Sequence, residues 1–173
     1  MTGCTGGANG WKDGIHTDCT AASFSGLTCT GYRLPTESEW EYASRGGTTG
    51  ATYLGNLSGT VTGCTTAQAN LDGIAWWCRN GGDRTNAVGG KTSNSFGLSD
   101  MLGNVWEWTG DWYGNYPAGS VTDPLGAGTG SARVRRGGSF DSAASQARAA
   151  YRSSVTPAYR YGSSGFRIAR TVP

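Results

Sequence analysis

The stretch FGLSDMLGNVWEWTGDWYG, residues 96–114, contains the strongest strand pattern of the chain. Along residues 105–109, Trp106 and Trp108 fall on one face and Glu107 falls on the other. Side chains alternate in this way along a β-strand that is buried on one side. We therefore expect a half-buried strand over residues 105–109.

The segment RLPTESEWEYASRGG, which begins at residue 33, predicts a short helix. Thr36 is a suitable N-cap, and Glu39 stands three residues later, as its partner in a capping box does. The two glycines at the end of the segment stop the helix. We expect a helix over residues 37–44, with Trp40 and Ala43 on its inner face.

The rest of the chain has few regular elements. Glycine-rich and polar residues fill 1–31 and 45–97, which predicts loops, although IAWWC at 74–78 has the composition of a short strand with two buried aromatics. RVRRGGSF, at 133–140, predicts a strand that enters a Gly-Gly bend. GFRIARTVP, at 165–173, predicts a terminal strand.

Length and composition limit the class of protein. A chain of 173 residues with 30 glycines and seven tryptophans predicts one irregular domain, residues 1–173, whose few large aromatics supply much of the buried area. The net charge of +2, without a Lys/Arg run, indicates no nucleic-acid partner. The polar start, MTGCTGGANGWKDG, and the lack of a long apolar run predict no membrane insertion and no signal peptide in this chain.

The cysteines and the single histidine do not form a recognisable catalytic or metal motif. No C-x-x-C pair occurs, so the usual zinc spacing is absent, and His16 has no partner in a motif. An odd number of thiols leaves at least one unpaired within the monomer, and one or two disulfides fit an oxidising compartment without their pairing being fixed. The five cysteines are Cys4, Cys19, Cys29, Cys64 and Cys78.

Six motifs between residues 33 and 170 carry a resemblance to a known family. RLPTESEWEYASRGG, FGLSDMLGNVWEW, DWYG, RVRRGGSF, RAAYR and GFRIA occur in the order and spacing typical of formylglycine-generating enzymes, the sulfatase-modifying factor family. The resemblance implies an α+β, C-type-lectin-like fold with short helices and strands and much ordered loop. The family usually has a longer segment before the RLPTE helix than the roughly thirty residues of this chain.

The chain departs from the family at the reactive atoms. Members oxidise a substrate cysteine with two of their own cysteines, which follow the GGS bend and bind copper, whereas this chain has no cysteine after Cys78. Ser142 stands near the position of the first catalytic cysteine. Because a hydroxyl cannot replace a thiolate as a ligand of a soft cuprous ion, we expect neither oxidase activity nor copper binding.

RSSVTPAYRYGSSGFR, residues 152–167, resembles a second group with this fold, the variable proteins of diversity-generating retroelements. In these, adenines of a template are copied with errors into the end of the gene. Asn codons scrambled in this way reach every residue with a pyrimidine-ending codon, but never Lys, Glu, Gln, Met or Trp.

The resemblance implies that loops at about 140–163 form a variable ligand-binding surface. The residues at its predicted positions obey this codon limit, whereas exposed loops normally use Lys, Glu and Gln freely. The ligand-binding positions are Phe140, Asp141, Ser142, Ala143, Ala144, Ser145, Tyr151, Ser153, Ser154, Val155, Ala158, Tyr159, Tyr161, Gly162 and Ser163. The alternative is an ordinary small-residue loop in a non-catalytic structural or accessory domain of the sulfatase-modifying factor family.

A variable surface needs a fixed frame. We expect Arg148, Arg152, Arg160 and Arg167 to donate to loop carbonyls and Phe166 to anchor the loops in the core. We also expect Tyr151, Tyr159 and Tyr161 to be largely exposed, side by side, as aromatic anchors of a binding patch. The partner implied by the resemblance is a protein or glycan on a host or another cell, bound from a virion or microbial surface.

The family resemblance also implies a structural Ca²⁺ site beside GNVWEW. Its ligands, transferred by motif, are the carboxylates of Asp100 and Glu107 and the backbone carbonyls of Gly103 and Val105. Hard oxygen ligands suit Ca²⁺. The alternative is that Asp100 caps the turn it begins and that Glu107 pairs with a framework arginine.

Overall fold

The computed structural model describes residue 27 and residues 31–171. These residues belong to two compact units, one formed by residues 1–33 and 170–173 and the other by residues 34–169. β1 (Tyr32–Arg33) and β6 (Ala169–Arg170) form a two-stranded sheet, and within the first unit Arg33 donates to the Thr171 hydroxyl at 3.2 Å. Most of this unit, including Cys4, His16, Cys19 and Cys29, lies outside the described residues, so the expectation of a single domain stays a prediction.

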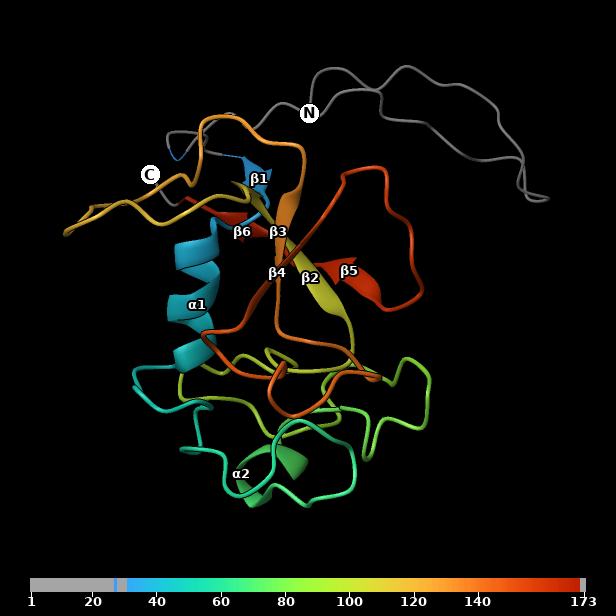
Figure 1. The fold of residues 1–173 in the computed structure, drawn as a ribbon. Helices are drawn as coiled ribbons and strands as arrows, with labels where there is room; N and C mark the ends of the chain where they lie inside the picture. The colour runs from blue at the N-terminus through green and yellow to red at the C-terminus, as the bar shows by residue number, and fades with distance from the viewer. Residues whose placement is uncertain (1–26, 28–30, 172–173) are drawn as a thin grey trace. The chain divides into compact units, whose positions relative to one another are not determined.

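The unit of residues 34–169 combines two helices with one mixed sheet, which confirms the α+β class (Figure 1). Helix α1 lies beside the sheet, and the four-residue helix α2 lies in the loop-rich part (Figure 1). The elements are α1 (Glu37–Arg45), α2 (Ala69–Asp72), β2 (Trp106–Trp112), β3 (Arg133–Arg136), β4 (Arg152–Val155) and β5 (Ser164–Phe166). No helix in the described ranges is long and apolar enough to span a bilayer.

Helix α1 begins and ends where the sequence predicts, within one residue. Thr36 accepts from the Glu39 amide at 3.1 Å, and the Glu39 carboxylate accepts from the Thr36 amide at 2.8 Å, which completes the capping box. Gly46 takes the left-handed conformation, with φ of 54°, and ends the helix. Trp40 is fully buried, and Ala43 packs against the same core.

The sheet has the strand order β4-β3-β2-β5, so β4 and β5 are its two edges. β3 is antiparallel to both neighbours, whereas β2 and β5 are parallel. The register aligns Arg152, Arg136, Glu107 and Gly165 in one row across all four strands. Because alternate residues face opposite sides, this row points its charged side chains toward α1.

Strand β2 is longer than predicted, and its polar face is the more deeply buried one. Glu107, Thr109 and Asp111 are buried, whereas Trp108 is half-buried. Their polar atoms have partners inside the fold: Glu107 accepts from Trp40 Nε1 at 2.6 Å, and Asp111 accepts from the Glu37 amide at 2.6 Å. Hydrogen bonds to α1 therefore make this burial tolerable.

The strand predicted at 74–78 does not form. This stretch has a single bridge, between Trp76 and Gly103, because it follows α2 through tight turns and packs by side chains. Trp77 is fully buried, but Trp76 is only half-buried beneath Lys91. A disulfide joins Cys64 to Cys78, which supplies the pairing that the sequence left open.

The predicted terminal strand at 165–173 is divided. Its first part belongs to β5 in the four-stranded sheet, and Ala169–Arg170 form β6 beside β1. The Gly-Gly bend after β3 is present, with φ of 92° at Gly137 and 76° at Gly138. A Cβ on Gly138 would lie 3.2 Å from Ala147 Cα, so this bend turns the chain closely against the loop that follows it.

Candidate functional site

The connection between β4 and β5, residues 156–163, crosses the sheet from one edge to the other (Figure 1). We name this segment the crossover. It has to pass the two central strands, β3 and β2. Arg135 of β3 and Trp106 of β2 line the same cavity as crossover residues, on the face opposite the charged row. The topology thus explains how residues far apart in sequence form one site.

The cavity measures about 260 Å³. Its lining comes from the two central strands, the loop after the Gly-Gly bend, and the crossover. The lining residues are Trp106, Arg135, Asp141, Ser142, Gln146, Tyr159, Tyr161 and Ser163. Five of them belong to the predicted ligand-binding set, namely Asp141, Ser142, Tyr159, Tyr161 and Ser163, so the fold brings these five together.

Two crossover tyrosines form the exposed rim of this cavity. The rings of Tyr159 and Tyr161 stack with centroids 5.5 Å apart and planes 15° apart, and the residues remain 41% and 60% exposed. Tyr151 differs from the prediction, because it is half-buried with its ring 6.0 Å from that of Trp106. The exposed aromatic anchor is therefore a pair and not a trio.

Arg135 lies in the cavity, above an aromatic ring. Its guanidinium is 4.6 Å from the Trp106 ring centroid, and its Nε donates to the Ser153 hydroxyl at 3.3 Å. Burial lowers the pKa of Arg135, against the opposing influence of Tyr159 and Asp141. The group nevertheless keeps its charge, because a guanidinium does not lose its proton in a protein.

The loop after the Gly-Gly bend is held by short-range hydrogen bonds. The Ser142 hydroxyl accepts from the Ser139 amide at 3.0 Å and lies 2.9 Å from the Ser139 hydroxyl, which also donates to Asp141. The Cys78 amide donates to the Ser142 carbonyl at 3.1 Å. The disulfide of Cys78 therefore lies next to the backbone of the candidate site.

The predicted ligand-binding set divides by exposure. Ser142, Ala144 and Ser163 are buried, although Ser142 and Ser163 line the cavity. The exposed members are Asp141, Ala158, Tyr159, Tyr161 and Gly162. The half-buried members are Phe140, Ala143, Ser145, Tyr151, Ser153, Ser154 and Val155.

The predicted frame is built mainly from arginine-carboxylate pairs. Arg152 binds both oxygens of Glu37 and also donates to the Gly114 carbonyl at 2.8 Å. Arg148 donates to the Ser145 carbonyl at 2.6 Å, as expected of a loop-holding residue. Phe166 is 68% exposed, so the prediction that it anchors the loops in the core is wrong. Its place in edge strand β5 explains this, because its side chain points away from the packed face.

Fully buried Arg136 completes this frame. Arg136 pairs with Glu41 and, at 3.4 Å, with Glu37, and it donates to the carbonyls of Ala149 and Ala150. Paired charges with several hydrogen bonds are the form in which buried ions are tolerated. The chain between β3 and β4 is thus fastened to helix α1.

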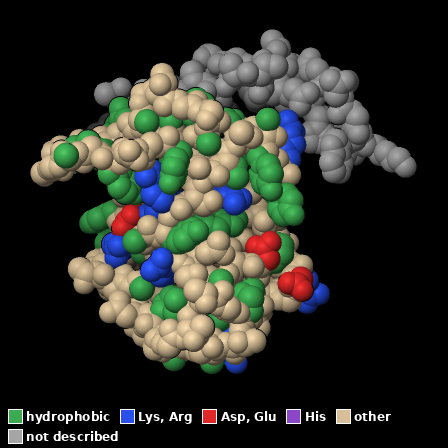
Figure 2. Space-filling view, in the orientation of Figure 1, with side chains coloured by type: hydrophobic (Ala, Val, Ile, Leu, Met, Phe, Trp, Pro, Cys, Tyr) green, Lys and Arg blue, Asp and Glu red, His purple; other side chains and the backbone are tan. Residues whose placement is uncertain are grey.

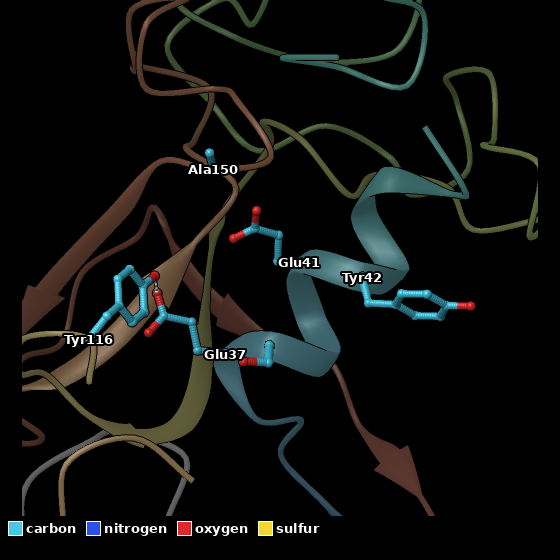
Figure 3. A pocket seen from close by; sticks show the side chains of 6 residues that line it. Glu37, Glu41, Tyr42, Tyr116 and Ala150 are labelled. Carbon is cyan, nitrogen blue, oxygen red and sulfur yellow. Dashed lines mark hydrogen bonds between the residues drawn. The ribbon is translucent and has the colours of Figure 1, made fainter. Parts of the chain in front are cut away.

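A second cavity, of about 340 Å³, lies beside helix α1 (Figure 3). Glu37, Glu41 and Tyr42 line it from the helix, and Tyr116 donates its hydroxyl to Glu37 at 2.9 Å (Figure 3). Both carboxylates already pair with arginines, Glu37 with Arg152 and Glu41 with Arg45. The carboxylates of this cavity therefore serve the frame.

The residues predicted to bind Ca²⁺ lie near one another but have other partners. Arg167 donates to both oxygens of Glu107, at 2.6 and 2.7 Å, and to the Asp100 carbonyl at 3.1 Å. Asp100 has φ of 55° and accepts from the Gly89 amide, while its buried Oδ1 has no hydrogen-bond partner. No group of three acidic, cysteine or histidine side chains suited to a metal is found in the described ranges.

The Arg167 guanidinium therefore occupies the side of Glu107 that a metal ion would need, as expected if Glu107 pairs with a framework arginine. A Ca²⁺ ion bound by Glu107 would have to share the carboxylate with Arg167, which disfavours it by repulsion. Val105 and Gly103 lie on the same segment, but the structure assigns no metal role to them. The Ca²⁺ site stays a prediction.

Sequence reasoning missed three lining residues, Trp106, Arg135 and Gln146. Trp106 and Arg135 were assigned only to strands, and the alternation along each strand gives a face but not the loop that covers it. Gln146 lies outside the set because its codon ends in a purine. The crossing of the sheet by residues 156–163 is the information that was missing.

Comparison with known proteins gives one family and several relatives. The model of the sulfatase-modifying factor enzyme 1-like domain matches residues 10–172. A formylglycine-generating enzyme of Streptomyces coelicolor is 44% identical over 147 residues, covering 80% of this chain and 46% of that protein. The serine/threonine-protein kinase pkn1 of Chlamydia caviae is 36% identical over 82% of this chain, but only 21% of its own length is covered.

Solved structures agree with this fold. The chain resembles Treponema denticola variable protein 1 with a TM-score of 0.72 and 38% identity, over 83% of this chain and 49% of that one. It resembles PvdO from Pseudomonas aeruginosa with a TM-score of 0.68 and 26% identity, over 82% and 53%. The fold is thus that of formylglycine-generating enzymes and variable proteins, and the chain spans about half the length of these relatives or less.

Proposed function

The chain belongs to the sulfatase-modifying factor enzyme 1-like family, and within it we propose a ligand-recognition protein that binds through the crossover and the adjoining loop. The observation that supports this most is the stacked, exposed pair of Tyr159 and Tyr161 at the rim of a cavity. Rigid exposed aromatics beside a hollow are the usual anchors of an interface. The structural likeness to a variable protein supports the same proposal.

Binding is tested with the labelled protein on arrays of glycans and cell-surface proteins. The double variant Tyr159→Ser, Tyr161→Ser should lose at least tenfold in affinity for any ligand found, because it removes the aromatic anchors. Tyr42→Ser is the control, since Tyr42 is even more exposed, at 70%, but lies on α1 beside the second cavity. Equal loss in both variants, or no ligand at all on the arrays, would count against the proposal.

Oxidase chemistry is not part of this proposal. No cysteine follows Cys78 in the sequence, and Ser142, near the first catalytic position, uses its hydroxyl to hold Ser139. Incubation with a sulfatase-type cysteine peptide, copper and a thiol reductant should therefore give no formylglycine. Formylglycine formed above the level of a protein-free control would show that the chain is an oxidase and would contradict its assignment as a recognition protein.

The variable surface would be renewed by a retroelement. The exposed members of the set project from the crossover and one loop, whereas the frame is made of residues outside that set, chiefly Glu37, Glu41 and Arg136. Exchange at exposed positions then leaves the frame intact. We expect to find, downstream of the gene, a near-copy of codons 136–168 that differs only at adenines, beside a reverse transcriptase gene. A genome that lacks both would contradict diversification by a retroelement.

The second candidate is a non-catalytic structural or accessory domain. The burial of Ala144 favours it, because this position belongs to the hydrophobic core and behaves as an ordinary packing residue. That candidate predicts no partner whose affinity depends on Tyr159 and Tyr161. If recognition holds, the partner is a protein or glycan on a host or neighbouring cell, and a virion or microbial surface is the natural bearer.

A further inference from the structure

Arg135 lacks the carboxylate partner that three framework arginines have. Arg136, Arg152 and Arg167 each pair with a glutamate. Arg135, over the described part of the chain, makes one side-chain hydrogen bond, to Ser153, and no ion pair. Its terminal nitrogens are therefore available to a ligand.

The surroundings of Arg135 suit a small polar group. Gln146 accepts from the Ala143 amide with its oxygen, and no described residue engages its Nε2 amino group. The cavity of about 260 Å³ is smaller than the roughly 300–1,000 Å³ of pockets that enclose drug-sized ligands. It has room for one side chain, with Tyr159 and Tyr161 at its rim.

The charge around the cavity favours an acidic partner. On the face drawn in Figure 2, Lys and Arg side chains lie among hydrophobic ones, together with fewer Asp and Glu side chains. Arg135 and Asp141 are the charged residues that line the cavity, and Asp141 already accepts from Ser139. A singly charged carboxylate fits this balance better than a doubly charged phosphate, which Asp141 would repel more strongly.

We propose that Arg135 is the anion-binding residue of this cavity and that the occupant is the carboxylate of an Asp or Glu side chain on a partner protein. The inference rests on the proposed recognition function and names the chemistry of its ligand. The guanidinium offers two parallel N–H groups to a carboxylate, the Trp106 ring packs against its planar face, and the tyrosine pair covers the partner's backbone. The Tyr, Ser and Gly of the crossover match the composition of surfaces that recognise proteins.

The test is an NMR titration of the ¹⁵N-labelled full chain, following the arginine Nε–H signals and the amides of the crossover. Three probes are compared: N-acetylglutamate N-methylamide, its glutamine counterpart of the same shape, and methyl glucuronide as a carboxylate on a sugar. The glutamate probe should bind at least fivefold more tightly than the glutamine probe and should shift the Arg135 Nε–H signal. Arg135→Gln should abolish this preference, and Arg135→Lys should retain part of it.

Arg84→Gln is the control, because Arg84 is exposed, outside the cavity, and carries the same charge change. If the glutamate and glutamine probes bind the unaltered protein equally well, the inference is overturned. It is also overturned if Arg135→Gln still prefers the glutamate probe. Tighter binding of the glucuronide than of the glutamate probe overturns the assignment to a protein side chain. Array binding that depends on Tyr159 and Tyr161 but shows no acidic preference leaves the recognition function standing and removes only the role of Arg135.

Discussion

Arg152 forms a bidentate salt bridge with Glu37, which lies 115 residues earlier in the sequence, with its Nε 2.8 Å from Oε1 and its Nη2 2.6 Å from Oε2. This pair joins the first turn of α1 to β4, the strand from which the crossover departs. The Glu37 side chain is almost fully buried, so removing Arg152 leaves its carboxylate with only the longer contact to Arg136, at 3.4 Å, and the hydrogen bond from Tyr116.

Arg152→Ala should therefore lower the free energy of unfolding by about 1.5–3 kcal/mol, as expected for the loss of hydrogen bonds to a buried charged group that keeps other partners. Urea titration measures the loss. Arg79→Ala is the control, because Arg79 forms an exposed pair with Asp72 at 3.4 Å and should cost less than about 1 kcal/mol. Losses of equal size in the two variants would show that the Arg152–Glu37 pair does not hold β4 to the helix.

The exposed crossover tyrosines should contribute little to stability. Tyr159→Ser and Tyr161→Ser are each expected to change the free energy of unfolding by about 0.5 kcal/mol or less, and the exposed Phe166→Ala should also be mild. Trp40→Ala should cost about 3–5 kcal/mol, since Trp40 is fully buried in the core. Denaturant titration of the four variants decides. Tyrosine replacements as damaging as Trp40→Ala would mean that the crossover is structural.

Asp111 makes stability depend on pH in a defined direction. Burial raises the pKa of Asp111 to about 6, although the hydrogen bond from the Glu37 amide opposes this. In the unfolded chain the pKa returns to its ordinary value near 3.8, so the folded protein binds the proton more tightly. Asp111 therefore lowers stability progressively as the pH rises from about 4 to about 6, and the loss is complete above that range.

Asp111→Asn keeps an acceptor for the Glu37 amide and removes the charge. The difference in stability between this variant and the unaltered protein should grow in favour of the variant, by on the order of 2 kcal/mol, as the pH rises from about 4 to about 8. Urea titrations at both pH values, with the exposed Asp123→Asn as control, measure the difference. A stability difference that does not change with pH would show that Asp111 titrates normally.

Calcium is tested by calorimetry. If Asp100 and Glu107 hold Ca²⁺, the thermal midpoint should rise with added calcium and fall with a chelator, because a ligand of the folded state stabilises it. Arg167→Gln should strengthen that response by freeing Glu107. A midpoint indifferent to calcium and chelator in both proteins would remove the metal site and leave the arginine pair as the partner of Glu107.

Local rules predicted the elements that local chemistry controls. The capping box of Thr36 and Glu39 gave helix α1, and the Gly-Gly bend followed β3 as expected. Trp76 and Trp77 suggested a strand because their composition is strand-like, but tertiary packing and a disulfide hold that segment without a ladder. Phe166 was misplaced for a related reason: apolar character does not tell which side of an edge strand faces the core.

The sequence predicted several of the loop residues that line the site, but not the strand residues that lie beneath them. Tyr159 and Tyr161 lie exposed together as expected, since the codon limit that marks them as variable positions is visible in the sequence. Arg135 was missed, because its role depends on the strand order, and strand order is set by contacts between residues far apart.

The strand order also constrains how long the crossover must be. Crossing three inter-strand spacings of about 4.8 Å, and returning along the strands from the end of β4 to the start of β5, requires on the order of 20 Å. Residues 156–163 extend to at most about 28 Å. The crossover thus tolerates changes of side chain, and insertions can bulge outward, but the deletion of more than about two residues would pull an edge strand out of register.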